Sequence, residues 1–124
     1  MREIKFRGKS LSNNEFVYGS LVFDVNNEWY IHYDNSAICI NYNKVIPETI
    51  SQYTGLKDKN GKEIYEGDIM KVSPPIWAKG GIFKVIYDNG RFIIEDNKVW
   101  QNIGTLIDYS EVIGNIYENP ELLV

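Results

Sequence analysis

The sequence predicts an all-β protein, either a sandwich or a barrel, from three observations. Turn-forming pairs recur along the chain, and short segments rich in Val, Ile, Tyr and Phe lie between them. No segment carries an apolar stripe at helical spacing over three or more turns. Tyr occurs nine times in 124 residues, and it favours half-buried strand positions because its ring packs while its hydroxyl stays hydrated. The turn pairs are Asn13-Asn14, Asn26-Asn27, Asp34-Asn35, Asn60-Gly61 and Asn89-Gly90.

The chain before Pro47 is expected to form a β-meander, and Pro47 begins a new section because proline cannot donate to a central ladder. The meander strands are expected at Glu3–Arg7, Phe16–Asp24, Glu28–Tyr33 and Ala37–Asn41. In the first strand Ile4 and Phe6 point to one side and the charged residues to the other, as in a half-buried strand. Gly19 within the second strand indicates a bulge or a close backbone approach.

A hairpin whose turn is Asn89-Gly90 has the clearest local pattern in the sequence. Both residues tolerate the positive φ angles that a type I′ turn requires. This turn pairs Asp88 with Arg91, Tyr87 with Phe92, and Lys84 with Glu95. These are two opposite-charge pairs and one aromatic pair, and each of the three pairs contributes about 0.2–1 kcal/mol to the stability of the hairpin. The turn and the cross-strand pairs therefore favour the same register.

The segment Asp58–Lys62 admits two hairpin registers. A two-residue loop at Asn60-Gly61 would place Lys59 opposite Lys62, which is repulsive. A type I turn followed by a left-handed glycine in a G1 bulge instead brings Asp58 near Lys62. We favour the second register.

The remaining sequence is expected to contain two further strands and a short C-terminal helical turn. A sharp turn at Glu66-Gly67-Asp68 leads into a strand over Ile69–Val72, and a strand over Glu111–Tyr117 comes near the end. The segment Trp100–Tyr109 fits a short helix or a strand. Asn119-Pro120 matches a helix start, with Asn as N-cap and Pro at the first position, and the two leucines that follow would dock this turn onto the core.

Between two of these strands, Ser73–Gly81 is the longest stretch without a strand pattern. Two prolines stiffen its beginning and two glycines loosen its end. A loop that carries Trp between strands is typical of a contact surface, so Pro75, Ile76 and Trp77 are the candidate binding residues. The alternative, that Trp77 folds back as a lid on the core, stays open.

The charge balance disfavours sequence-independent nucleic-acid binding. The protein has 13 basic and 17 acidic residues, a net charge of −4. Proteins that bind duplex DNA usually carry a basic stripe that displaces counterions. The densest basic stretch, Lys57–Lys62, contains Asp58 and is followed by Glu63.

Residues for catalysis or metal binding are scarce. His32 is the only histidine, and Cys39 the only cysteine, so a two-His zinc site or a nucleophile–His pair with its own orienting partner is not expected. An EF-hand loop that starts at Asp58 fails, because its required Gly falls on Glu63 and its bidentate Glu falls on Ile69. The carboxylates Glu48, Glu63, Glu66 and Asp68 are expected to be solvated turn residues. We therefore expect no catalytic residue, no metal and no cofactor.

The single cysteine excludes an intrachain disulfide and fits a reducing compartment. Cys39 lies in a short apolar run, where a thiol behaves as a small hydrophobe. The N-terminus is charged where a signal peptide needs an apolar stretch, and the apolar runs are far shorter than a membrane helix requires. A cytoplasmic protein with no membrane association is expected.

Five segments, taken in order along the sequence, resemble the YopX family of small proteins encoded by bacteriophages and prophages. They are Met1–Arg7, Val45–Ile50, Gln52–Leu56, Asp58–Ile69 and Val112–Leu122. Gly8-Lys9-Ser10 departs from many members, which have an aromatic soon after the first strand. The resemblance implies one YopX-like domain over residues 1–124, with a small SH3-like β-barrel built from residues 47–124 after the meander of residues 1–46. It also implies a phage or prophage gene product in a bacterial cytoplasm, with no assigned catalytic residues.

Three functions compete at this point. The favoured one is a non-enzymatic interaction module that forms a homo-oligomer or binds a protein partner. The second is a small barrel that binds single-stranded nucleic acid by stacking bases on aromatic side chains. Such binding also uses a basic groove, which the negative net charge does not favour. The third is an enzyme that uses paired carboxylates, which need to converge in one concave pocket.

Overall fold

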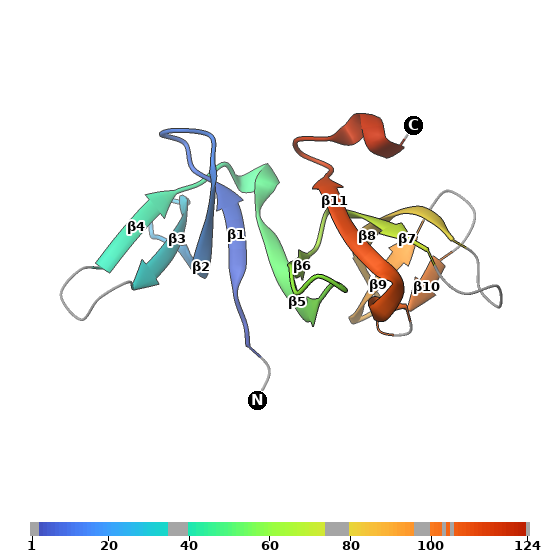
Figure 1. The fold of residues 1–124 in the computed structure, drawn as a ribbon. Coiled ribbons are helices and arrows are strands. Elements are labelled where there is room, and N and C mark those ends of the chain that lie inside the picture. The colour runs from blue at the N-terminus through green and yellow to red at the C-terminus, as the bar shows by residue number, and fades with distance from the viewer. Residues whose placement is uncertain are drawn as a thin grey trace. The chain divides into compact units, whose positions relative to one another are not determined.

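The computed structural model describes residues 3–34, 40–73, 80–95, 100–102, 104 and 106–123. The fold is mostly β, with two antiparallel sheets and short 3-10 helices (Figure 1). Its contacts divide the protein into two compact units, Met1–Tyr53 and Thr54–Val124. No helix in the described ranges is long and apolar enough to cross a membrane.

The first unit is the predicted meander with one strand added. Its strands are β1 (Phe6–Lys9), β2 (Phe16–Phe23), β3 (Trp29–Asp34), β4 (Ile40–Lys44) and the beginning of β5 (Ser51–Lys57), in the sheet order β4-β3-β2-β1-β5. A short 3-10 helix, η1 (Pro47–Thr49), precedes β5. β1 starts at Phe6 rather than Glu3, because its ladder with β2 pairs Phe6 with Gly19 and Lys9 with Phe16. The expected strand at Ala37–Asn41 lies mostly outside the described residues, which resume at Ile40.

Local polar contacts explain the β2–β3 connection. The Asp24 carboxylate Oδ1 accepts the backbone N–H groups of Asn26 and Glu28 at 2.9 and 3.0 Å. Asn27 takes a left-handed φ of 62°, a conformation that Asn adopts more readily than most residues. The turn aligns Phe23 with Trp29 and fixes the register of the two strands.

The second unit combines a short hairpin with a five-stranded sheet. The second half of β5 pairs with β6 (Glu63–Tyr65). The sheet order is β10-β9-β8-β7-β11. Its strands are β7 (Asp68–Val72), β8 (Gly81–Asp88), β9 (Arg91–Glu95), β10 (Trp100–Asn102) and β11 (Ser110–Asn115), with the 3-10 helices η3 (Ile107–Tyr109) and η4 (Pro120–Leu123). The ambiguous segment 100–109 thus contains both a strand and a helical turn, and the predicted C-terminal helical turn is confirmed as η4.

The barrel expected from residues 47–124 does not close among the described residues. Closure would require the two end strands of one sheet to pair with each other. Within the described ranges β10 and β11 end one ladder without pairing to each other. The turn at Glu66-Gly67 also sends β6 and β7 into different sheets, so the ladder is interrupted where a barrel would continue.

One hydrophobic core lies within the second unit. Alternate residues of β7 and β8 point into it, including Met70, Val72, Phe83 and Val85, which are all buried. Ile64, Ile94, Leu106 and Val112 complete the buried cluster. Burial of each of the larger side chains away from water contributes about 1.5–3 kcal/mol to the free energy of folding.

The Asn89-Gly90 hairpin is confirmed with the predicted register. Asn89 and Gly90 have φ angles of 51° and 81°, as a type I′ turn requires. The ladder pairs Asp88 with Arg91, Tyr87 with Phe92 and Lys84 with Glu95. The rings of Tyr87 and Phe92 meet edge to face, with their centroids 5.2 Å apart.

The favoured register of the Asp58–Lys62 turn is also confirmed. The Gly61 N–H donates to the Asp58 carbonyl at 3.0 Å, and the Asp58 N–H donates to the Lys62 carbonyl at 2.8 Å. Gly61 is left-handed, with φ +82°. Asp58 therefore lies beside Lys62, and the repulsive pairing of Lys59 with Lys62 is avoided.

Candidate interaction surface

Five ring side chains share one face of the first unit's sheet. They are Phe16 and Tyr18 on β2, Tyr30 and His32 on β3, and Tyr42 on β4, and we call this surface the ring face. They share a face because alternate residues of a strand point the same way, and the ladder aligns His32 with Ser20 and with Tyr42. Tyr42 is 60% exposed and Tyr18 46% exposed.

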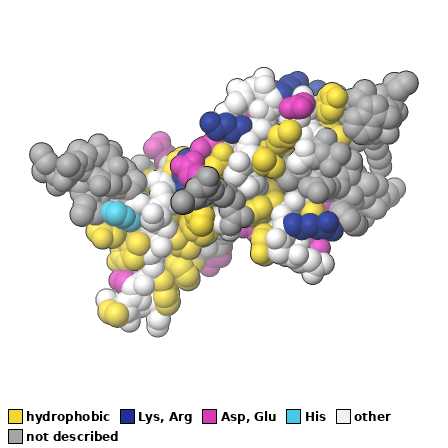
Figure 2. Space-filling view, turned by 90° about the horizontal axis from the view of Figure 1, so that it is seen from below, with side chains coloured by type: hydrophobic (Ala, Val, Ile, Leu, Met, Phe, Trp, Pro, Cys, Tyr) yellow, Lys and Arg dark blue, Asp and Glu magenta, His cyan; other side chains and the backbone are white. Residues whose placement is uncertain are grey.

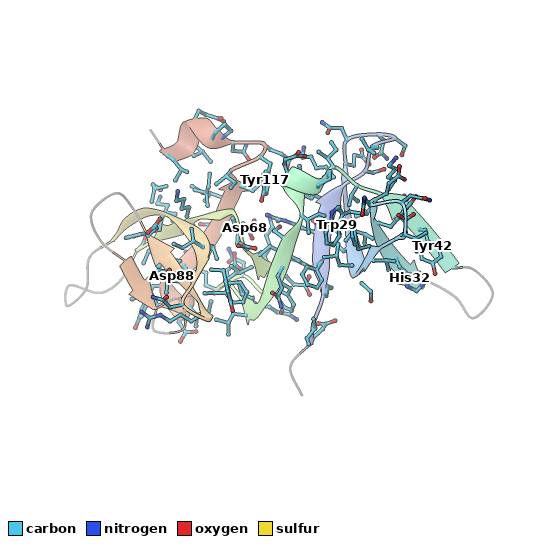
Figure 3. All side chains as sticks on the ribbon, turned by 180° about the vertical axis from the view of Figure 1, so that it is seen from behind. Trp29, His32, Tyr42, Asp68, Asp88 and Tyr117 are labelled. Atoms are coloured by element: carbon cyan, nitrogen blue, oxygen red, sulfur yellow. The ribbon has the colours of Figure 1, made fainter. Side chains whose placement is uncertain are left out.

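The most exposed side chain of the ring face, Tyr42, stacks on His32. The imidazole of His32 lies 4.8 Å from the Tyr42 ring, centroid to centroid, with 27° between the planes (Figure 3). His32 lies on β3, which has hydrogen-bonded neighbours on both sides. Its Nε2 is buried and has no hydrogen-bond partner among the described residues. The ring therefore acts here as a packing group for Tyr42.

The charges beside the ring face are paired with one another. The Lys44 ammonium lies 2.8 Å from a Glu28 carboxylate oxygen, and the Tyr30 hydroxyl donates to the other oxygen at 3.0 Å. The hydrogen bond from Lys44, followed by that from Tyr30, lowers the pKa of Glu28. The same contact with Glu28 raises the pKa of Lys44. This corner of the surface is consequently near neutral.

Two further cations on β1 are buried around Phe16. The Arg7 guanidinium carbon lies 4.5 Å from the centroid of the Phe16 ring, and the Lys9 ammonium lies 5.3 Å from it. The Arg7 Nε also donates to the Ser51 hydroxyl at 3.0 Å. These cation–π and hydrogen-bond contacts use both side chains within the fold.

A second aromatic pair lies on the opposite face of the same sheet. The rings of Phe23 and Trp29 are 4.4 Å apart, and Phe23 is 50% exposed. Figure 2 shows hydrophobic side chains reaching the molecular surface at several places, among them beside the histidine. In the described part of the first unit, the buried hydrophobic side chains are Ile31, Val45 and Tyr53. Much of the unit's ring area is therefore exposed or only half-buried.

The four carboxylates expected to be solvated turn residues differ in burial, and the expectation is wrong for Asp68. Glu48 is exposed, whereas Glu63 and Glu66 are half-buried and Asp68 is buried. Both Glu63 and Asp68 bind Tyr65: the Tyr65 hydroxyl donates to Glu63 Oε1 at 3.0 Å, and the Tyr65 N–H donates to Asp68 Oδ2 at 2.8 Å. Within the described ranges, no group of three or more His, Cys, Asp or Glu side chains is placed to hold a metal ion.

Asp58 has a structural role that sequence reasoning recognised only in part. Its carboxylate accepts the N–H groups of Asn60 and Lys62 within the turn and of Val112 on β11, all at 2.9 Å. Burial acts to raise the pKa of Asp58, but the three backbone N–H groups together hold it below its ordinary value. The contacts within the turn could be predicted from the sequence pattern. The contact with Val112 could not be predicted in this way.

The predicted binding residues Pro75, Ile76 and Trp77 lie outside the described residues, as does Cys39. Their roles therefore stay predictions.

A family model described as YopX protein matches residues 5–124. The chain belongs to the YopX family. The crystal structure of protein EF1440 from Enterococcus faecalis is similar to this YopX family protein, at 30% identity and a TM-score of 0.63, with both proteins fully covered. The crystal structure of the protein YopX from Bacillus subtilis shares the fold, at 21% identity and a TM-score of 0.62 over 100% of this protein and 98% of that one. None of the curated proteins matches this sequence.

Proposed function

We propose that this YopX family protein is a non-enzymatic accessory protein that acts through protein–protein contacts, either with further copies of itself or with a protein partner. The observation that carries the proposal is the exposure of rings on the first unit's sheet, 60% for Tyr42 and 50% for Phe23. A sheet normally buries its apolar face against another layer. Rings left at the surface of such a sheet are typical of interfaces, where Tyr and Trp are enriched.

The local charges also favour a protein partner. Lys44 is neutralised by Glu28, and Arg7 and Lys9 are buried around Phe16. A single-strand binder needs a basic groove beside its stacking rings. The ring face offers rings without such a groove, so binding of single-stranded nucleic acid is the less favoured function.

The use of the buried carboxylates supports a non-enzymatic role. Asp58 is occupied by three backbone N–H groups, and Asp68 accepts the Tyr65 N–H. Carboxylates that hold turns in this way stabilise the fold, so we assign them no role in catalysis. The loop around Trp77 is proposed as a second contact region, and a phage or prophage origin in a bacterial cytoplasm is proposed from family resemblance.

Sedimentation analysis over a wide range of protein concentration tests the proposal for self-association, and capture of a partner from prophage-induced host cells tests it for a heterologous protein. Because Tyr42 and Phe23 lie on opposite faces of the sheet, Tyr42→Ala or Phe23→Ala should weaken the association, according to which face the partner contacts. Tyr87→Ala is a matched control, because Tyr87 is also a strand tyrosine and is 55% exposed, but lies in the second unit.

The proposal fails if the protein stays monomeric at every concentration and captures no protein that Tyr42→Ala or Phe23→Ala releases. It also fails if Tyr87→Ala weakens association as much as Tyr42→Ala does. An electrophoretic shift with single-stranded DNA or RNA at low salt, lost in Tyr42→Ala, would favour the nucleic-acid function instead.

A further inference from the structure

Two Asn-Gly pairs lie at exposed hairpin turns of the second unit. Asn60-Gly61 connects β5 to β6, and Asn89-Gly90 connects β8 to β9. All four residues are exposed, so access to water does not distinguish the two pairs.

Asn-Gly pairs undergo a spontaneous reaction with a defined atom balance. The backbone nitrogen of Gly loses its proton and attacks the Cγ atom of Asn, so that a new bond between nitrogen and carbon forms. The bond between Cγ and the amide nitrogen of Asn breaks and ammonia leaves, which closes a succinimide ring. Water then opens the ring to Asp or isoaspartate. The reaction consumes one water, releases one ammonia and changes no oxidation state.

The attacking nitrogen is held in only one of the two turns. The Gly61 N–H donates to the Asp58 carbonyl at 3.0 Å. The Asp58 carboxylate also holds the N–H groups of Asn60 and Lys62 at 2.9 Å, so the whole turn is fixed around Asp58. To react, Gly61 would have to give up its hydrogen bond and rotate within this network.

The Asn89-Gly90 turn lacks such a lock. In a two-residue type I′ turn the N–H of the second turn residue does not take part in the hydrogen bonds between the strands. The Gly90 N–H accordingly has no hydrogen bond to any described residue. The Asn89 amide makes a long contact of 3.5 Å to the Asp88 carboxylate. A Cβ added at Gly90 or at Gly61 would meet no atom within 4 Å, so the two turns differ in hydrogen bonding and not in steric room.

We propose that Asn89 is a site of spontaneous deamidation and isoaspartate formation, and that Asp58 protects Asn60 from the same reaction. Conversion of Asn89 adds one negative charge to a protein of net charge −4, directly beside Asp88. Isoaspartate also lengthens the backbone by one methylene. That insertion disturbs the pairing of Tyr87 with Phe92 next to the turn.

Peptide mapping by mass spectrometry during incubation in mildly alkaline buffer tests the proposal. Deamidation at Asn89 should be about fivefold to tenfold faster than at Asn60, the factor that one net hydrogen bond supplies. Asn89→Asp provides the reference for the charge change. Equal rates at the two sites, or a faster rate at Asn60, would overturn the proposal.

Asp58→Ala tests the protective role directly. Without the carboxylate the turn loses the hydrogen bonds to the N–H groups of Asn60 and Lys62 but keeps the backbone carbonyl that holds Gly61. The rate at Asn60 should therefore rise part of the way toward that at Asn89, while the rate at Asn89 is unchanged. Circular dichroism shows whether this variant is folded. If it is not, the ratio of the two rates in the unsubstituted protein still decides the proposal.

Discussion

The carboxylate of Asp58 accepts the N–H of Val112 at 2.9 Å, across 54 positions of the sequence. The same side chain organises its own turn through the N–H groups of Asn60 and Lys62. One buried carboxylate thereby fastens the β5–β6 hairpin to β11 within the second unit. Buried polar groups satisfied in this way are costly to remove, because their partners are left without hydrogen bonds.

Asp58 should make the protein's stability dependent on pH in the acid range. Because its folded-state pKa is lowered, its contribution is fully present above the ordinary pKa of an aspartate, about 3.9, and is lost as the pH falls through the folded-state pKa. We expect Asp58→Asn to lower the free energy of unfolding by about 2–3 kcal/mol at neutral pH. Urea unfolding at neutral pH and at pH values below the pKa of a free aspartate measures both effects.

The difference between Asp58→Asn and the unsubstituted protein should shrink as the pH falls. Asp88→Asn is the matched control, since Asp88 is an exposed aspartate beside the other Asn-Gly turn. A loss of stability in Asp58→Asn that is the same at every pH would contradict the role of the charged carboxylate.

Gly61 and Gly67 form a matched pair for measuring the cost of a close contact. Both are left-handed, at φ +82° and +88°, but an added Cβ meets nothing at Gly61 and lies 3.1 Å from the Tyr117 ring at Gly67. Gly61→Ala should lower the free energy of unfolding by about 1–2 kcal/mol, from backbone strain alone. Gly67→Ala should cost about 2–4 kcal/mol, since the ring must also move. If the two substitutions lower the free energy of unfolding equally, measured by thermal or urea unfolding, the Tyr117 ring moves aside without an energetic penalty.

Gly114 allows Asn119 to close the turn after β11. A Cβ at position 114 would lie 2.6 Å from Asn119 Oδ1, which accepts the Asn115 N–H at 3.2 Å. Gly114→Ala should therefore destabilise the protein by about 1–3 kcal/mol. In a double-mutant cycle the same substitution should cost less when Asn119→Ala has already removed the obstruction. Additive losses would mean that Gly114 is required for another reason.

Phe83 and Phe23 should respond very differently to truncation. Phe83 is fully buried in the core of the second unit, and Phe23 is 50% exposed in the first. Phe83→Ala should lower the free energy of unfolding by about 3–5 kcal/mol. Phe23→Ala should lower it by about 1 kcal/mol or less, because exposed substitutions are usually mild. A large loss for Phe23→Ala would show that its ring stabilises the fold, and would remove it from the proposed docking surface.

The cross-strand pairs of the β8–β9 hairpin should differ in strength and in salt dependence. Double-mutant cycles should give about 0.5–1.5 kcal/mol for the Tyr87–Phe92 ring pair. The Lys84–Glu95 pair, with its charged atoms 3.9 Å apart and partly exposed, should give less than about 0.5 kcal/mol. Added salt should reduce the coupling of the ion pair only. A salt-sensitive ring pair would mean that the cycle reports some other contact.

Local sequence patterns were sufficient wherever neighbouring residues alone set the conformation. Asn89-Gly90 requires positive φ angles, and the charges and rings on either side agree with a single register. The Asp58–Gly61 turn was predicted for the same reason, because only one of two registers avoids opposing lysines. Such choices depend on interactions over a few residues, and these are visible in a single sequence.

The candidate surface was not predictable in the same way. Tyr18, His32 and Tyr42 fall on three different strands, and only the ladder registers place them on one face. A shift of one residue in any ladder would have turned one of these rings to the other face. The sequence indicated surplus aromatic residues, but it pointed to Trp77 rather than to this sheet.

From the sequence alone came the mostly-β class, the meander, the hairpin registers and the family, because each depends on alternation, turn chemistry or the order of segments. The tertiary structure decided that the described strands do not close into a barrel, that Asp58 reaches Val112, and that the contacts divide the protein within β5. The physical reason is the range of the interactions. Strand alternation and turn preferences act between near neighbours, whereas sheet closure and long-range hydrogen bonds depend on how distant segments meet.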